Sequence, residues 1–240
     1  MLLHPVGLDL TYWGAAIAAL RPDYDVVACD LPGHGASPGT AEDWTLPRAT
    51  EAVRAFVRGL GAGSVHLVGL SVGGMLAQSL VLTDPAAVRS LTLIDTAAAF
   101  SDEGRAGMRA RAATARSSGM QGVLASTIER WFTAQTAAER PDLIDRVSKT
   151  LLADDPLTHA AMWDMISELD LIDDLRHIDC PTLVLVGEHD QSSPVPAARQ
   201  LRDGIARASL AVVANAAHLS PLERPDVVNA HLTDFLGRTW

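Results

Sequence analysis

Short, largely apolar runs alternate with longer amphipathic stretches in the amino-terminal part of the chain, and again near its end. Residues 65–68, 91–94 and 182–187 are such runs, each bounded by glycine or polar residues. Runs of this kind are typical of strands buried on both faces of a parallel sheet, and the stretches between them have helical spacing. The pattern predicts an α/β fold with a mostly parallel sheet, in which strand and helix alternate to about Thr96 and resume near Pro181.

Between these two parts the chain has helical periodicity only. We predict helices over about 102–116, 121–133, 140–153 and 156–169. An all-helical insertion above the carboxyl ends of the strands would shape the ligand pocket, because open α/β sheets bind ligands at that edge. We therefore expect a core of residues 1–97 and 181–240 and a helical cap of residues 98–180. The cap side chains that could line the pocket are Arg130, Trp131, Phe132, Met162, Trp163 and Met165. For each apolar one, packing between cap and core is an equally good explanation.

Composition narrows the class of protein. A length of 240 residues suits one domain, and a net charge of −10 disfavours nucleic acid and anionic membranes as partners. No apolar stretch is long enough for a membrane span and no signal peptide is evident, so we expect a cytoplasmic protein. Two cysteines exclude a disulfide framework, and the eight histidines lack metal-ligand spacing. We expect neither a metal nor another cofactor.

The motif that carries chemistry is Gly69-Leu70-Ser71-Val72-Gly73, between the run at 65–68 and a helix-like stretch from Gly74 to Leu82. A serine on a sharp strand-to-helix turn needs small residues two before and two after it, so that strand and helix can approach. The helix N-terminus also directs free N–H groups toward negative charge beside the serine. This context predicts a nucleophile elbow with Ser71 as the nucleophile.

A nucleophilic serine needs a base, and the base needs a carboxylate to orient it. His218 lies in a loop after the strand predicted at 209–213, and Asp190 follows the strand at 182–187. The order Ser71, Asp190, His218 is the order that α/β-hydrolases use. Glu188 is the alternative acid, although we expect it to face solvent or a loop amide. Asp95 is a second alternative, and a turn residue at a strand end is the simpler explanation for it.

An oxyanion hole should combine the N–H after the serine, from Val72, with an N–H in the loop after the first strand. In that loop Pro5 has no N–H, so Val6 is the predicted donor, and Gly7 leaves room for the backbone to turn. The alternative is a tight turn before a helix that begins near Thr11.

Together these residues resemble the α/β-hydrolase superfamily, and within it the 3-oxoadipate enol-lactonase group of small capped hydrolases. The matching stretches are residues 29–37, 69–73, 130–133, 181–190 and 216–220. Members of the family usually carry a β-hairpin before the strand that precedes the oxyanion loop, whereas Met1 here falls within that strand. The resemblance thus implies a six-stranded sheet with residues 25–29 at its edge, or a missed upstream start. An apolar edge of this kind favours cover by a loop or by a second copy in a homodimer.

The resulting hypothesis is a serine hydrolase that cleaves a small-molecule ester or lactone through an acyl-enzyme. The same three residues could instead serve C–C hydrolysis, perhydrolysis or hydroxynitrile cleavage. An alternative of another class is a hydrolase-like ligand receptor whose triad is slow or idle. We expect a neutral or weakly polar short-chain ester or lactone to be turned over at least as well as an anionic lactone, because the pocket candidates of the last cap helix are apolar. Arg130 is the one cap arginine beside an aromatic pair, and the others fall on helix positions that favour a solvated face.

Overall fold

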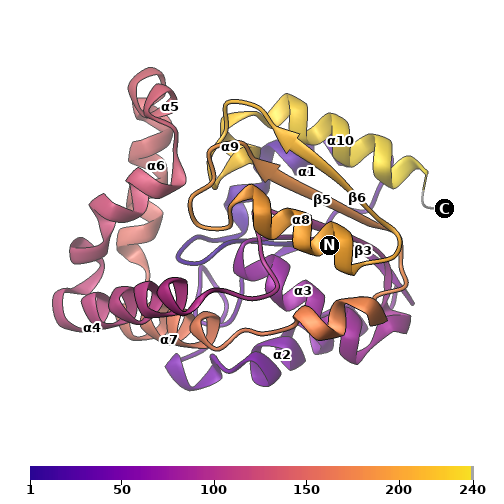
Figure 1. Cartoon of the computed structure of the whole chain (residues 1–240), viewed down its shortest axis with the longest axis horizontal. Helices are drawn as coiled ribbons and strands as arrows, with labels where there is room; N and C mark the ends of the chain where they lie inside the picture. Colours follow the sequence, from indigo (N-terminus) through magenta and orange to yellow (C-terminus); the bar gives the residue numbers. More distant parts are fainter. Residues whose placement is uncertain (239–240) are drawn as a thin grey trace.

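The computed structural model describes residues 1–238 and contains a six-stranded sheet in which every pairing is parallel (Figure 1). The strands lie side by side in the order β2-β1-β3-β4-β5-β6. Their bounds are β1 Leu2–Leu3, β2 Ala28–Cys29, β3 Val65–Leu70, β4 Val88–Ile94, β5 Thr182–Gly187 and β6 Ala208–Val213. The three central strands, β3 to β5, are almost wholly buried, as their apolar runs predict.

Helices cover both faces of the sheet. Figure 1 shows α1 (Gly14–Leu20) and α10 (Pro225–Gly237) on one side and α2 (Leu46–Gly59) and α3 (Val72–Thr83) on the other. The helix α8 (Val195–Gly204) packs against β5 and β6, and α9 (Ser220–Glu223) is a single turn before α10. Short 3-10 segments occupy Leu10–Trp13, Ala41–Asp43, Pro85–Ala87 and Ile172–His177. Among residues 1–238 no helix combines the length and the apolar character needed to cross a bilayer.

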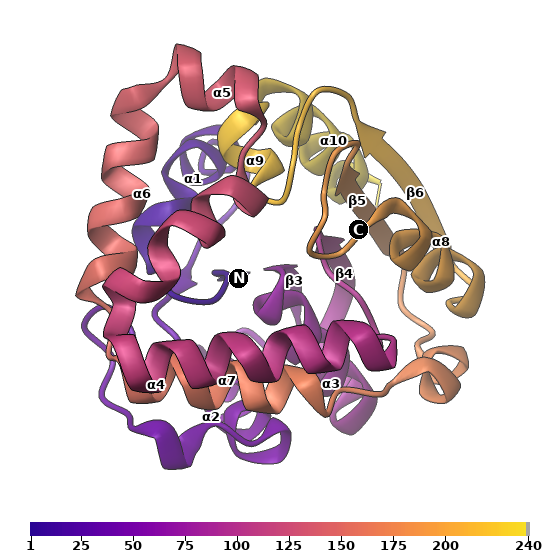
Figure 2. The same cartoon turned by 60° about the vertical axis from the view of Figure 1, so that its left-hand side comes forward.

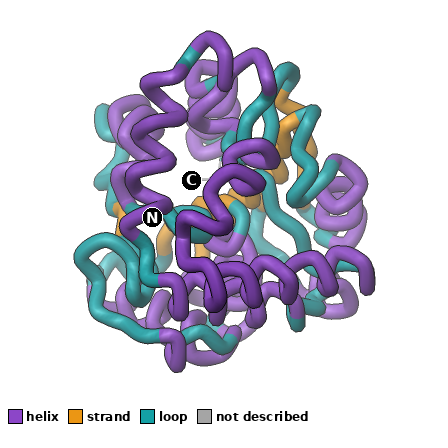
Figure 3. The backbone as a smooth tube through the Cα atoms, turned by 90° about the vertical axis from the view of Figure 1, so that its left-hand side faces the viewer, coloured by secondary structure: helices purple, strands orange, loops and turns teal. Residues whose placement is uncertain are grey.

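Four helices lie between β4 and β5, and we call them the helical insert. They are α4 (Asp102–Trp131), α5 (Ala134–Glu139), α6 (Pro141–Ala153) and α7 (Pro156–Ser167). The first part of α4 runs alongside α7, and its second part rises toward α5 (Figure 2). The face of the molecule that the insert forms is mostly helix (Figure 3). The predicted helices agree with α4, α6 and α7, except that two of them are joined in α4, and α5 lies where no helix was predicted.

The joint in α4 is at Gly119, which has φ 64° and ψ −170° inside an otherwise helical run. Glycine adopts a positive φ at little cost, so the chain can bend there and re-enter the helix at once. The sequence predicts an interruption at this place, and the structure shows that it is a bend of one residue.

At the sheet edge, β2 is shorter than predicted. Only Ala28 and Cys29 form the strand, although the Val27 carbonyl still accepts a bond from the N–H of Leu2. A short edge strand offers few unpaired backbone groups to another chain, which reduces the need for cover. Cover of this edge by a second copy stays a prediction.

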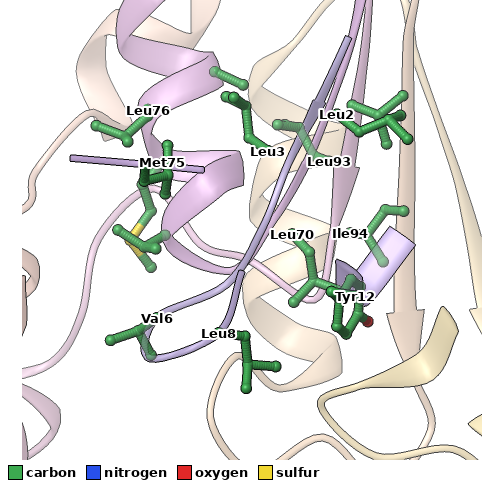
Figure 4. Packing of buried hydrophobic residues seen from close by; sticks show 14 of the residues in the cluster. Leu2, Leu3, Val6, Leu8, Tyr12, Leu70, Met75, Leu76, Leu93 and Ile94 are labelled. Carbon is green, nitrogen blue, oxygen red and sulfur yellow. The ribbon is translucent and has the colours of Figure 1, made fainter. Parts of the chain in front are cut away.

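The core lies on both sides of the sheet, where buried side chains of the strands meet those of the helices. Figure 4 shows Leu2 and Leu3 of β1 beside Leu93, and then Val6 and Leu8 along the loop that leaves β1. All five side chains are buried. This packing fixes the loop that leads from β1 toward the candidate site.

Candidate functional site

Ser71 sits at the turn between β3 and α3 with φ 54° and ψ −121°, a conformation that is strained for a residue with a side chain. A Cβ on Gly69 would collide with the backbone of Gly73, and a Cβ on Gly74 would come 2.7 Å from Cγ2 of Thr96. The hydroxyl of Thr96 donates to the Ser71 carbonyl at 2.7 Å. The strand-to-helix elbow predicted from the sequence is therefore present, and close packing holds it.

Three side chains meet at this elbow. Nε2 of His218 lies 3.0 Å from Oγ of Ser71, and Nδ1 of His218 lies 2.9 Å from Oδ2 of Asp190. All three residues are at most 5% exposed. An ionised carboxylate only accepts hydrogen bonds, so the pairing with Asp190 puts the ring proton on Nδ1 and leaves Nε2 to accept from the serine. The arrangement can remove the Ser71 proton and stabilise the resulting imidazolium.

The second oxygen of Asp190 is fixed by the backbone. Oδ1 accepts from the N–H groups of Ser192 at 2.7 Å and Ser193 at 3.0 Å. The alternative acid Glu188 is exposed and accepts from the N–H of Asn215 at 3.0 Å, as expected for a residue that faces a loop amide. Within residues 1–238, Asp190 is the carboxylate hydrogen-bonded to His218.

Asp95 is a buried carboxylate that joins two loops of the site. It accepts from the Gly187 N–H at 2.8 Å and from the N–H and hydroxyl of Ser220 at 3.1 and 2.7 Å. Burial, and then the charge of Asp190, raise the pKa of Asp95 well above its usual range. Asp95 is a turn residue with φ 48°, as expected, and it also ties the end of β5 to the loop of His218. No local pattern in the sequence indicates that second role.

The predicted oxyanion donors Val6 and Val72 both lie next to the elbow. A Cβ on Gly73 would come 2.9 Å from the His4 carbonyl oxygen, so the loop after β1 contacts the first turn of α3. In the part of the chain that the structure describes, neither the Val6 nor the Val72 N–H has a hydrogen-bond partner. Gly7 has φ 67°, which fits its predicted role in turning the loop.

His4 holds this loop in place. The Leu31 N–H donates to Nε2 of His4 at 2.8 Å, so Nδ1 carries the proton and donates to the Pro5 carbonyl at 2.8 Å. Burial, and then the charge of His34, lower the pKa of His4 to about 4. Sequence reasoning did not single out His4, since one histidine in an apolar run has no spacing that indicates a role.

A buried polar network connects the core to the helical insert beside the same loop. Asp154 lies between His159, with 2.8 Å from its Oδ2 to Nδ1, and His34, with 3.5 Å from its Oδ1 to Nε2. Burial raises the pKa of Asp154, but the hydrogen bond with His159 and the nearby His34 ring outweigh it and bring the pKa to about 2. The Trp163 indole donates to Nε2 of His159 at 2.9 Å. A Cβ on Gly7 would lie 3.0 Å from the His159 ring, so this network abuts the loop of Val6.

The end of α4 is joined to the loop of His218. The Leu219 N–H donates to the Trp131 carbonyl at 3.2 Å. Glu223 accepts from the N–H and hydroxyl of Thr133 through one oxygen and from the Ala217 N–H through the other.

An open cavity of about 500 Å³ lies beside this junction, and its lining includes Arg130 and the predicted pocket residue Phe132. The other predicted pocket residues are at most 7% exposed and belong to α4 or α7: Trp131, Met162, Trp163 and Met165.

Neither cysteine is a competing nucleophile. Burial raises the pKa of Cys29 to about 11 and also raises the pKa of Cys180, so both thiols stay protonated at neutral pH. Within residues 1–238 no group of three His, Cys, Asp or Glu side chains is placed to hold a metal ion.

Known proteins resemble this chain in sequence over most of its length. The model of the alpha/beta hydrolase family matches residues 1–231. Two relatives from Acinetobacter baylyi are 3-oxoadipate enol-lactonase 1, 30% identical over 93% of this chain and 82% of its own length, and 3-oxoadipate enol-lactonase 2, 26% identical over 94% and 84%.

Solved structures agree. The enol-lactonase from Burkholderia xenovorans LB400 is 28% identical and superposes with a TM-score of 0.92 over 99% of this chain and 90% of its own. A thermophilic esterase from Thermogutta terrifontis is 29% identical, with a TM-score of 0.92 over 99% and 89%. The chain therefore belongs to the alpha/beta hydrolase family and has its fold.

Proposed function

We propose that this chain is a serine hydrolase that cleaves a small ester or lactone through an acyl-enzyme. The observation that carries the proposal is the hydrogen-bonded series from Ser71 through His218 to Asp190, at 3.0 and 2.9 Å. The relatives named enol-lactonase and esterase support the reaction class. Residues 98–180 would act as a cap on the core of residues 1–97 and 181–240.

The reaction begins when Oγ of Ser71 attacks the substrate carbonyl carbon and its proton passes to Nε2 of His218. Asp190 stabilises the imidazolium that forms. The N–H groups of Val6 and Val72 would bind the oxyanion, as both lack another partner within the described residues. The helix α3 begins at Val72, so its N-terminus adds favourable potential at the same place.

The tetrahedral intermediate then collapses. The alkoxide oxygen leaves with the proton from His218, and the acyl group remains on Ser71. With a lactone the departing hydroxyl stays attached to the acyl chain. Water next gives a proton to His218 and attacks the acyl carbon, and the proton returns to Ser71 as the carboxylic acid product departs. Every proton transfer in this cycle uses Nε2 of His218.

A panel of p-nitrophenyl esters and simple lactones tests the reaction class. We expect turnover of short esters by the wild-type chain and its loss in Ser71→Ala, with the fold retained because the residue is small. Circular dichroism checks the fold of the variant. A wild-type chain that binds these compounds without hydrolysing them would contradict the proposal and favour a ligand receptor.

A further inference from the structure

The helical insert meets the core at His34, a histidine with an acceptor at each ring nitrogen. Nδ1 of His34 lies 3.0 Å from the Pro32 carbonyl oxygen, which also accepts from the indole N–H of Trp44 at 3.1 Å. A carbonyl oxygen only accepts hydrogen bonds, so Nδ1 carries a proton. Nε2 of the same ring faces Oδ1 of Asp154 at 3.5 Å, and neither atom has a hydrogen-bond partner within residues 1–238.

A second proton, on Nε2 of His34, explains this contact. The side chains of His34 and Asp154 are at most 3% exposed, and a buried carboxylate without a cation beside it is unfavourable. Within the described residues the basic side chains that pair with Asp154 are His34 and His159. His159 is neutral, because its Nε2 accepts from the Trp163 indole and therefore carries no proton. The counter-charge for Asp154 is thus the imidazolium of His34.

The other groups that face His34 favour the same state. Burial lowers the pKa of His34, but the Asp154 carboxylate, and then the Pro32 carbonyl and the charge of Asp30, outweigh it and raise the pKa above its ordinary value. From the loop after β1, the ring of His4 approaches to 5.3 Å between ring centres. His4 is neutral near pH 7, since its pKa is about 4.

On the core side, the ion pair lies beside residues 4–7, which we call the oxyanion loop. The loop begins with His4, whose ring contacts that of His34. His4 accepts from the N–H of Leu31 and donates to the carbonyl of Pro5, so it ties the loop to the core. A change in the position of His34 therefore acts on the residue that anchors the oxyanion loop.

On the insert side, the ion pair reaches the same loop through His159. Oδ2 of Asp154 accepts from Nδ1 of His159 at 2.8 Å, and the Trp163 indole holds the opposite nitrogen of that ring. The ring packs on Gly7, where an added Cβ would lie 3.0 Å from it. Gly7 has φ 67°, so the backbone of the loop turns where the insert touches it. Asp154 therefore orients the side chain that backs the oxyanion loop.

We propose that the ion pair of His34 and Asp154 holds the helical insert against the oxyanion loop, so that both are positioning residues for the oxyanion donor Val6. The effect on turnover rests on the proposed hydrolase function, whereas the ion pair and its contact with the loop do not. Loss of the second proton would leave a bare Nε2 opposite a carboxylate oxygen, and the attraction would disappear.

The sign of the pH dependence follows from the raised pKa of His34. The attraction is complete below the ordinary histidine pKa of 6.5 and is lost as the pH rises through the higher pKa of the folded chain. The proposed base His218 has to be neutral to accept the serine proton, so turnover first rises with pH. The loss of the ion pair then adds a fall on the alkaline side.

NMR of the histidine rings and the backbone amides tests the ion pair without any substrate. We expect His34 to titrate with a pKa above 6.5, and the amide signals of Val6 and Gly7 to shift with the same midpoint. In Asp154→Asn the pKa of His34 should be lower than in the wild type, and the amide shifts at that midpoint should disappear. A pKa of His34 at or below 6.5, or loop amides that do not follow it, would overturn the proposal.

The pH profile of turnover distinguishes positioning from a merely structural role. An asparagine at position 154 can accept from His159 through its oxygen and donate to a neutral His34 through its nitrogen, so Asp154→Asn keeps the contact without the second proton. We expect kcat/KM of the wild type to fall by about tenfold on the alkaline side and Asp154→Asn to lack this fall. Asp154→Ala should lower kcat about tenfold at every pH and change KM less, because oxyanion donors act mainly in the transition state.

The matched control is Asp145→Asn, which changes an exposed carboxylate of α6 that pairs with Lys149. Its alkaline fall should equal that of the wild type. An alkaline fall that persists in Asp154→Asn, or that Asp145→Asn also removes, would refute the positioning role and leave the hydrolase proposal intact. If no ester is turned over, the hydrolase proposal fails, and the NMR titration still decides whether the ion pair holds the oxyanion loop.

Discussion

His218 uses both ring nitrogens, and this determines what each neighbouring residue can do. Because Asp190 only accepts hydrogen bonds, it fixes the proton on Nδ1 and keeps Nε2 free for Ser71. An asparagine at this position can present its own N–H to Nδ1. The ring would then carry its proton on Nε2 and could no longer act as a base toward the serine.

We therefore expect Asp190→Asn to lower kcat by about three to four orders of magnitude, the scale found for the equivalent change in a serine-protease triad. Steady-state hydrolysis of p-nitrophenyl acetate measures the effect. Glu188→Gln is the control and should stay close to wild type, since Glu188 contacts the Asn215 N–H. Near wild-type turnover in Asp190→Asn would transfer the acid role to Glu188 or Asp95.

His4 makes the stability of the fold depend on pH. Its pKa is about 4 in the folded chain against an ordinary 6.5, so between these values the unfolded chain binds more protons. The contribution of His4 to the free energy of unfolding is complete above pH 6.5. It is lost as the pH falls to about 4, which lowers the free energy of unfolding by roughly 3 kcal/mol. Urea unfolding of wild type and His4→Gln at several pH values should show a weaker pH dependence in the variant. Parallel curves would contradict this account.

At the scale of elements, the bend in α4 depends on one glycine. Gly119 has φ 64°, and a side chain there is strained whatever space surrounds it. We expect Gly119→Ala to lower the free energy of unfolding by about 1 kcal/mol or more. Gly107→Ala is the control within the same helix, because it has an ordinary φ and open space around it. It should stabilise the chain by up to about 1 kcal/mol. Changes of the same sign in both variants would show that the bend is not fixed by Gly119.

Glu223 of α9 connects the insert to the loop of His218. Glutamine has one acceptor oxygen, so Glu223→Gln would leave either the half-buried N–H of Thr133 or the buried N–H of Ala217 without a partner. We expect a loss of about 1–3 kcal/mol in the free energy of unfolding, measured in urea. Glu103→Gln, at an exposed position in the first turn of α4, should change it by less than about 0.5 kcal/mol. Equal effects in the two variants would contradict this role for Glu223.

For the whole molecule, the sheet and the elbow could be predicted from local patterns. Apolar runs locate β3, β4 and β5, and their carboxyl ends bring Ser71, Asp190 and His218 to one edge. These features depend on residues that are close in sequence or on the regular geometry of a parallel sheet.

The contacts between segments far apart in the sequence could not be predicted in this way. The pairing of Asp154 with His34 joins the insert to the core, and the position of Arg111 on Trp163 joins two helices of the insert. Helical periodicity says which residues share a face, but it does not say which element that face meets. The sequence therefore placed Arg111 in solvent, and it gave no sign of the network around Asp154.

Ser71 is the nucleophile in the proposed mechanism, and covalent labelling reports on the reactivity of its hydroxyl. The chain is treated with a fluorophosphonate, and peptide mass spectrometry locates the adduct. We predict a single adduct, on the peptide that contains Ser71, and none in Ser71→Ala. Weaker labelling in Asp190→Asn would follow from the same account. An adduct on another residue, or rapid ester hydrolysis by a chain that the reagent does not label at Ser71, would contradict it.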